Sequence, residues 1–383
     1  MHSINRSLSA SLFAPALTAA LIVACQVSAH AFDMNGIDVK PRASVTGTYD
    51  DNVTFVRDGE IDDFVTRLSA GLEAKAEGKT HSLNVNGNIH QEFFIDNSEF
   101  DNTSGDVNAD YKQEFDPYNR IRLRDSFLRA EEARTFEEAF NRTQGRYAYY
   151  RNRFLFDYMH DFTKQWSLTG RYGNEISEFQ RSDIRDSSLN TAGVEALYQH
   201  TSTLKFLFAY DFSIRDFQGG SDAETHTLST GVLYYLTKQL YAEARVGVDF
   251  IDAFNNDDFT EPMFRARLTD DINETTSWDI AFEKEYAPTS YTEDIFDYWQ
   301  VSTTLRKQFN PRWNAYLSGF YGDGDYQTAD RTDTLWGANV ALTYDITKIW
   351  KGTVKYTFTD VNSDLASQEY TRNTIQAGLA LQF

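Results

Sequence analysis

Arginine at alternate positions is the feature of this chain with the clearest chemical potential. Two stretches carry arginine at every second residue, and a further arginine alternates with apolar neighbours. Successive side chains of a β-strand point to opposite faces, so residues two apart share a face. We therefore expect three consecutive strands to place six guanidinium groups on one wall. The six residues are Arg120, Arg122, Arg124, Arg151, Arg153 and Arg171.

Two roles for this basic wall follow from the chemistry of guanidinium. Its planar fork of donors fits carboxylate and sulfate groups, so the wall could guide an anionic saccharide or another anion. Alternatively, the arginines pair with Asp and Glu side chains and make a wet interior rigid, and we favour this second role. Asp125 falls on the same side as Ile121 and Leu123, so the pattern predicts a bulge or the membrane edge nearby.

The sequence predicts no catalytic site, cofactor or metal. It contains no nucleophile elbow, phosphate-binding loop, dinucleotide fingerprint or zinc-protease motif. The acidic segments 255–258 and 323–325 lack the ordered spacing of a calcium loop. The five histidines beyond residue 31 are also scattered without metal-ligand spacing; they are His81, His90, His160, His200 and His226. A hydrolase built from dispersed residues stays open as a less favoured alternative.

Composition excludes several classes of protein. The chain has 383 residues, 41% of them hydrophobic and 15% aromatic, with a mean hydropathy of −0.53. No apolar run after residue 31 approaches the ~20 residues of a membrane-spanning helix. A formal net charge of −21 argues against a nucleic-acid partner, because the phosphate backbone attracts basic proteins. Aromatic runs separated by polar, Asn- and Asp-rich segments are typical of β proteins.

Residues 1–31 read as a cleavable secretory signal. Arg6 supplies the positive start, residues 12–24 form the apolar stretch, and Ala29-His30-Ala31 is a small-residue cleavage site. An alternative is a lipoprotein signal in which Cys25 becomes lipidated. Cys25 is the only cysteine, which excludes an internal disulfide. We expect a periplasmic lead over residues 32–42 and one domain over residues 43–383.

A constant period runs through the chain. Short turns centred near residues 164, 201, 238, 275, 311 and 348 are spaced by 36 or 37 residues, which matches one hairpin with its loop. Earlier turns are expected near residues 78–79 and 116–119. Nine longer polar segments lie between these eight turns, so we predict eighteen strands with both termini at the short-turn end.

The strands alternate between an apolar and a polar face. Phe206, Phe208 and Tyr210 share one face, while Lys205 and Asp211 lie on the other. A half-buried soluble sheet shows the same alternation, but nothing is left over to cover eighteen strands. Tryptophans also follow short turns, where an interfacial girdle would lie. We therefore assign the apolar face to lipid. These tryptophans are Trp166, Trp278, Trp313 and Trp350.

The final strand supports a closed sheet. Ile375, Ala377, Leu379, Leu381 and Phe383 alternate with polar or small residues up to the last residue. An apolar strand left at an open edge would aggregate, and closure into a barrel removes that edge. The fold class we predict is all-β, a transmembrane antiparallel up-and-down barrel of about 18 strands.

Three features together resemble a known family. The segment Thr48-Tyr49-Asp50-Asp51-Asn52-Val53, the hairpin period and the terminal Phe383 are similar to outer-membrane β-barrel porins of proteobacteria that are associated with exopolysaccharide synthesis and export. The resemblance spans residues 32–383 and rests on strand patterns, so it carries no site residues. It implies a wide barrel in the Gram-negative outer membrane that serves as a conduit or accessory for secreted polysaccharide.

The leading function is therefore a porin-like channel, with polysaccharide export as its more specific form. A structural or docking barrel with a closed lumen remains the alternative. The expected partners are outer-membrane lipid and lipopolysaccharide, small solutes or polysaccharide, and the barrel-assembly machinery, which would recognise Phe383. An aqueous interior is expected at this size unless loops or the lead plug it.

Overall fold

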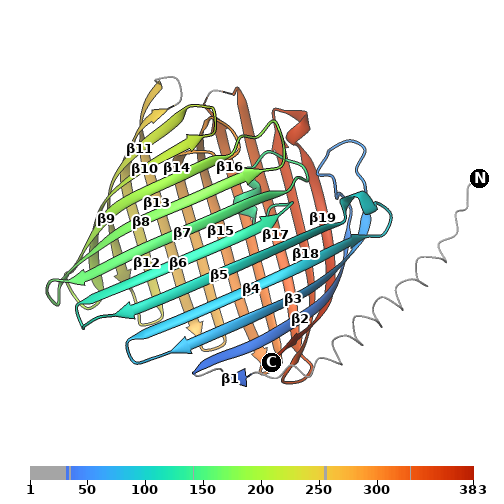
Figure 1. The fold of residues 1–383 in the computed structure, drawn as a ribbon. Coiled ribbons are helices and arrows are strands. Elements are labelled where there is room, and N and C mark those ends of the chain that lie inside the picture. The colour runs from blue at the N-terminus through green and yellow to red at the C-terminus, as the bar shows by residue number, and fades with distance from the viewer. Residues whose placement is uncertain (1–31, 34–35, 141, 254–256, 328) are drawn as a thin grey trace, which may run out of the picture.

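The computed structural model shows one antiparallel sheet that closes on itself (Figure 1). It describes residues 32–33, 36–140, 142–253, 257–327 and 329–383, so the predicted signal over residues 1–31 lies outside them. The barrel consists of β2 to β19. Their bounds are β2 Ile37–Asp50, β3 Asp63–Glu77, β4 His81–Phe94, β5 Asn102–Glu114, β6 Asn119–Ala130, β7 Tyr149–Asp161, β8 Trp166–Phe179, β9 Ser187–Gln199, β10 Leu204–Phe217, β11 Asp222–Tyr235, β12 Leu240–Ala253, β13 Asp257–Asn273, β14 Thr276–Pro288, β15 Ile295–Asn310, β16 Trp313–Tyr326, β17 Arg331–Asp345, β18 Trp350–Ser363 and β19 Tyr370–Gln382.

Every strand pairs with its sequence neighbours, and β19 pairs with β2 to close the ring. At this seam Ile375 lies opposite Tyr49 and Leu381 lies opposite Ala43. The predicted closed barrel of eighteen strands is confirmed. The short strand β1 (Phe32–Asp33) pairs with the start of β2. Three short helices accompany the sheet among the described residues, namely η1 Ser98–Phe100, α2 Phe136–Phe140 and η3 Ala366–Gln368.

The predicted short turns all connect neighbouring strands at one end of the barrel. The threonine that recurs in them has a structural role. Thr237 Oγ1 accepts a hydrogen bond from the backbone N–H of Leu240 at 2.9 Å, and Thr347 Oγ1 accepts one from Trp350 at 3.1 Å. Such side-chain turns stabilise a tight reversal. The chemical repetition in the sequence therefore reflects one turn built several times.

Two boundary expectations were wrong. The first barrel strand begins at Ile37 rather than Ala43, because the predicted lead continues the pairing with β3 as far as Ile37 opposite Ala76. The bulge, one of the two alternatives expected near Asp125, is also missing from this described region. β6 pairs with β5 and β7 in unbroken register through Asp125, which lies near the middle of the strand.

The outward face carries exposed apolar side chains, as predicted. Val354 is 56% exposed, Val340 is 50% exposed and Phe208 is 49% exposed. Trp313 and Tyr344 pack with tilted rings at 4.5 Å between centroids at the short-turn end. A second tilted pair, Trp336 and Phe358, packs at 4.4 Å towards the loop end. Aromatic belts at both ends of an apolar band are typical of a membrane-spanning barrel.

Trp336 and Tyr344 allow the width of this band to be estimated. They lie eight residues apart on β17. A strand rises about 3.4 Å per residue and tilts by roughly 40°, so the two belts are about 20 Å apart across the membrane. This is close to the height expected of a lipid-facing band. No helix in the described part of the chain is both long and apolar enough to cross a membrane.

Candidate functional site: a luminal constriction

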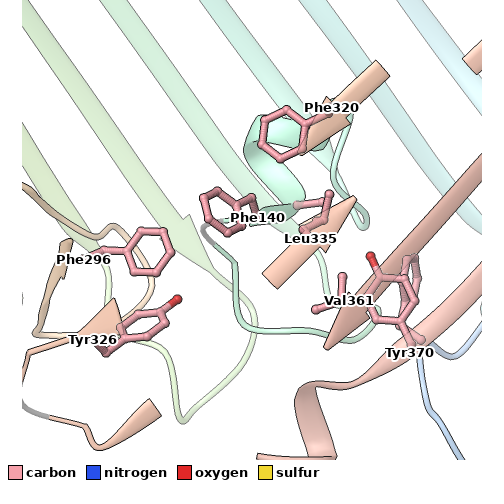
Figure 2. Packing of buried hydrophobic residues seen from close by; sticks show 9 residues of the cluster. Phe140, Phe296, Phe320, Tyr326, Leu335, Val361 and Tyr370 are labelled. Atoms are coloured by element: carbon pink, nitrogen blue, oxygen red, sulfur yellow. The ribbon is translucent and has the colours of Figure 1, made fainter. Parts of the chain in front are cut away.

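The connection between β6 and β7, residues 131–148, folds into the barrel. Its short helix α2 packs on the inner wall at β16 and β17, across the lumen from the strands that carry it. Figure 2 shows Phe140 of this connection facing Phe320 and Leu335. The longest polar loop of the sequence therefore narrows the lumen near the loop end.

Aromatic packing holds α2 in place. Phe140 is 3% exposed and meets Phe296 edge to face at 5.1 Å, Phe320 at 5.7 Å and Tyr298 at 6.0 Å. Rings at these distances attract one another beyond their area of contact. Phe296 and Leu335 are fully buried, so water is excluded from this cluster.

Two glycines of the barrel wall leave room for the helix. A Cβ atom at Gly322 would lie 2.7 Å from Cε1 of Phe140, and one at Gly337 would overlap the ring of Phe136. Real Cβ atoms do not approach a ring carbon so closely, and close approach of another segment is a common reason for glycine in a strand. The inner wall is therefore shaped to receive α2.

A charge network fixes the start of the connection. Oε2 of Glu132 lies 2.8 Å from Nη2 of Arg372 and 3.6 Å from Nη2 of Arg146. Arg372 also bonds Asp50 with its Nε, at 3.0 Å from Oδ1. Asp50 belongs to β2 and Arg372 to β19, the two strands that close the ring. Glu132 thus ties the inserted connection to the seam of the barrel.

Burial alone would raise the pKa of Glu132, but the guanidinium groups of Arg372, Arg146 and Arg67 outweigh it. The net effect is a pKa well below the usual range for a glutamate. The opposite holds for its neighbour Glu131, whose pKa is raised by burial. Glu132 is therefore ionised, and its charge is stabilised by the three arginines.

The far end of the connection is held by Arg142 and Gln144. Arg142 is 2% exposed, donates from Nη2 to the carbonyl of Glu131 at 2.9 Å, and stacks over the ring of Tyr147 at 4.2 Å. The backbone N–H of Gln144 donates to Oε1 of Gln368 at 2.7 Å. Cation–π contacts of this kind strengthen when they are shielded from water. Both ends of residues 131–148 are thus fixed.

The β2–β3 connection, residues 51–62, meets the inserted segment. Asn52 and Val53 are fully buried, and Nδ2 of Asn52 donates to the carbonyls of Val56 at 2.6 Å and Thr371 at 3.0 Å. Nε of Arg146 donates to the carbonyl of Val53 at 3.3 Å. The segment that carries the family resemblance therefore closes the seam and supports the constriction.

The six arginines of the predicted basic wall lie on the inner face of β6, β7 and β8, as the strand register places them. Each has a carboxylate partner. The pairs are Arg120 with Asp161 at 2.9 Å, Arg122 with Asp110 at 2.5 Å, Arg124 with Asp157 at 2.7 Å, Arg151 with Glu138 at 3.1 Å, Arg153 with Glu175, and Arg171 with Glu195 at 2.6 Å. Five partners belong to neighbouring strands, whereas Glu138 belongs to α2. Guidance of an anion by this wall stays a prediction.

A recess of about 260 Å³ lies against this wall. Arg124 and Arg153 line one side of it, and Asn84, Asn86 and Asn108 line the other. Amides and guanidinium groups offer donors and acceptors to a polar solute. Asp110 also lines the recess, so its wall carries both signs of charge beside the amides.

The sequence reasoning missed the residues that form the constriction, namely Glu132, Phe140, Arg142, Arg146 and Arg372. One signal could have found them. Phe136, Ala139 and Phe140 have helical spacing inside a segment taken as a polar loop. An apolar helix face in a loop needs a surface to cover it, and the lumen provides that surface.

The five scattered histidines are not brought together. His90 contacts Ser69 at 2.8 Å and lies 3.5 Å from Asp106, whereas His160 contacts Asn119 and His226 contacts Tyr210. Among the described residues, no group of three or more His, Cys, Asp or Glu side chains is arranged to hold a metal ion.

Comparison with known proteins adds a partial family match. A family model described as "Putative beta-barrel porin 2" matches residues 296–383, which form most of β15 and all of β16 to β19. No curated protein matches the sequence. The match is confined to the C-terminal strands, so the architecture rests on the strand pairing described above.

The chain is also similar to several solved structures at low identity. OccAB3 of Acinetobacter baumannii is 12% identical, with 90% of this chain and 99% of that chain covered and a TM-score of 0.46. OpdL of Pseudomonas aeruginosa is 12% identical, with 91% and 100% covered and a TM-score of 0.48. The siderophore receptor PirA of Pseudomonas aeruginosa is 10% identical, with 90% and 80% covered and a TM-score of 0.46.

Proposed function

We propose that this protein is a passive channel of the Gram-negative outer membrane for polar solutes, controlled at its loop end by residues 131–148. The observation that carries the proposal is a closed barrel with a charged lumen and an inserted connection that is fixed at both ends. The match of the C-terminal strands to a porin family model supports it. We place the short turns in the periplasm, as in other barrels of this kind. We assign no catalytic reaction to the protein.

The lumen carries both signs of charge in close pairs. Arg171 and Arg245 share Glu195, at 2.6 Å and 2.7 Å, and Nε of Arg265 pairs with Glu283 at 2.9 Å. Paired charges leave no strong field of one sign, so we expect weak ion selectivity and ready passage of neutral polar solutes. The net negative charge of the chain does not by itself predict a cation channel.

The test is conductance in a planar lipid bilayer. The wild-type protein is compared with a variant in which a short Gly-Ser linker replaces residues 134–144, which contain α2. The matched control replaces residues 218–221 of the β10–β11 connection with the same kind of linker. We expect small conductance steps from the wild type and the control, and severalfold larger steps from the α2 variant. Silence of all three proteins would favour a closed docking barrel instead.

The docking-barrel alternative has one observation in its favour, the dry aromatic cluster around Phe140. A cluster that excludes water also obstructs passage where it lies. The two functions differ in what the α2 variant does. A docking barrel would stay silent because other parts of its lumen are also closed, whereas a controlled channel would open.

Polysaccharide export is the more specific form of the proposal. It is supported by the family resemblance and by the amide-lined recess beside Arg124 and Arg153. A polymer would need α2 to leave the lumen. Liposome swelling in oligosaccharides of increasing length tests this, because the α2 variant should admit longer chains than the wild type. Equal size limits in the two proteins would count against export.

The role of the luminal arginines can be tested by charge reversal. Arg122→Glu together with Arg153→Glu places carboxylates beside Asp110 and Glu175. We expect the reversal potential in a salt gradient to shift towards cation selectivity. Arg312→Glu with Lys348→Glu makes the same change of net charge in two short turns and serves as the control. An unchanged reversal potential would leave the arginines a structural role only.

A further inference from the structure

One charged side chain lies where the barrel should be apolar. Asp125 pairs in register with Ala109 of β5 and Phe154 of β7, and its neighbours on the same face, Leu123 and Phe127, are apolar. Phe127 is 41% exposed on the outer face, and Asp125 is exposed beside it. Asp125 therefore points away from the lumen.

Its depth makes this position unusual. Asp125 is near the middle of β6, which runs from Asn119 to Ala130. Every other outward-facing charged side chain of the described strands lies within four residues of a strand end. Asp125 lies five residues from Ala130, the nearer end of its strand, and is therefore deeper in the sheet than those side chains. Charge in the middle of a bilayer is costly and usually marks a functional contact.

The partners of Asp125 within the chain are insufficient for a carboxylate in hydrocarbon. Nδ2 of Asn152 donates to Oδ1 of Asp125 at 3.0 Å, and this is a single neutral donor. By contrast, each of the six arginines in the lumen has a charged partner. The isolated carboxylate needs further donors, and lipid tails have none.

Small residues lie on the outer face around Asp125. Ala109 is directly opposite Asp125, and Gly87 and Gly105 lie on the same outward face of β4 and β5. Small residues allow another protein to approach closely. The depth of the charge and these small neighbours both favour a protein contact at this position.

We propose that the outward face of β4 to β7 around Asp125 binds a second copy of this chain within the membrane. A two-fold axis along the membrane normal keeps each residue at its own depth. The carboxylate of Asp125 and the amide of Asn152 lie at the same depth, since they touch. Two copies can therefore exchange these bonds, with Asn152 of each donating to Asp125 of the other. The pair of Asp125 and Asn152 contains both an acceptor and a donor, so the same pair in a second copy can bond to it. This favours a second copy over an unrelated partner.

Cysteine cross-linking in native membranes tests the proposal. In a Cys25→Ser background, Val107→Cys places a thiol on the proposed face, and Val340→Cys places one on β17, outside that face. The two valines are matched in exposure, at 49% and 50%. We expect a cross-linked species of twice the monomer mass from Val107→Cys and none from Val340→Cys.

Substitution of Asp125 tests its part in the contact. Asp125→Asn keeps an acceptor and should preserve cross-linking through Val107→Cys. Asp125→Arg removes the acceptor and brings two cations together, so the cross-linked fraction should fall about tenfold, equivalent to ~1.4 kcal/mol. Heat-modifiable mobility in gels confirms that each variant is folded. Monomers at both cysteine positions, a cross-link to a different protein, or an unchanged fraction in Asp125→Arg would each overturn the proposal.

Discussion

At the scale of single residues, the constriction depends on a few buried charges that no strand pattern reveals. Glu132 is the clearest case, because it joins the inserted connection to Arg372 at the seam. The alternation of β6 to β8 was enough to place six arginines on one inner face. It could not show which carboxylates they meet, because pairing between strands depends on register. Register follows from closing the whole ring.

Removing Arg372 should release the constriction. Arg372→Met leaves Asp50 and Glu132 without their shared cation, and breaking a buried ion pair in this way costs roughly 3–5 kcal/mol. We expect residues 131–148 to leave the wall part of the time, which raises the mean conductance in planar bilayers. Arg267→Met removes a luminal arginine whose side chain is 57% exposed and serves as the control. Equal conductance of the two variants would show that Glu132 is not the anchor.

The constriction should withstand mild acid. The pKa of Glu132 in the folded protein lies below its ordinary value of 4.5, so its stabilising contribution is fully present above that pH. The contribution is lost only as the pH falls through the lower, folded pKa. Conductance should therefore show no opening attributable to Glu132 between pH 8 and pH 5. Glu132→Gln should conduct more than the wild type throughout this range. Opening of the wild type between pH 6 and pH 5, absent from Glu132→Gln, would contradict the assignment.

At the scale of elements, α2 is the piece that turns a wide barrel into a narrow one. The sequence predicted the turns and the strand count because both repeat with a constant period. It did not predict α2, which occurs once and has only five residues. Its position depends on side chains of β15 to β17, which lie more than 150 residues later in the chain. A local sequence pattern cannot predict a contact between residues that lie so far apart in the chain.

Filling the recess for α2 should displace it. Gly337→Leu places a side chain where the ring of Phe136 lies, and overpacking of this kind costs about 1–3 kcal/mol. We expect larger conductance steps than in the wild type, with little loss of barrel stability because α2 is not part of the sheet. Gly319→Ala is the control, since its Cβ would lie 3.5 Å from Thr303, an ordinary contact. Unaltered steps in Gly337→Leu would mean that α2 does not limit passage.

At the scale of the whole molecule, closure explains why the outer face can be predicted from sequence. Each strand has only two faces, and a closed ring has only an inside and an outside. One apolar face per strand is therefore sufficient to predict which side chains point outward. The lumen is harder to predict because charges, glycines and inserted connections all meet there. Asp125 shows the limit of the simple rule. Its local pattern suggested an irregular strand, yet the strand is regular and the charged side chain lies on its outer face.

A charge introduced at the middle of the outer face should therefore destabilise the barrel far more than one placed in the lumen. Val340 is 50% exposed and points to lipid near the middle of β17, while Ala341 points inward and lines a polar cavity of about 610 Å³. Arginine facing lipid near the membrane centre costs roughly 2–4 kcal/mol. Denaturant titration of folding into lipid vesicles should show a loss of this size for Val340→Arg. Ala341→Arg should change the free energy of unfolding by much less, because water in the lumen solvates the guanidinium group. If both variants were equally stable, the face that we assign to lipid would be in contact with water.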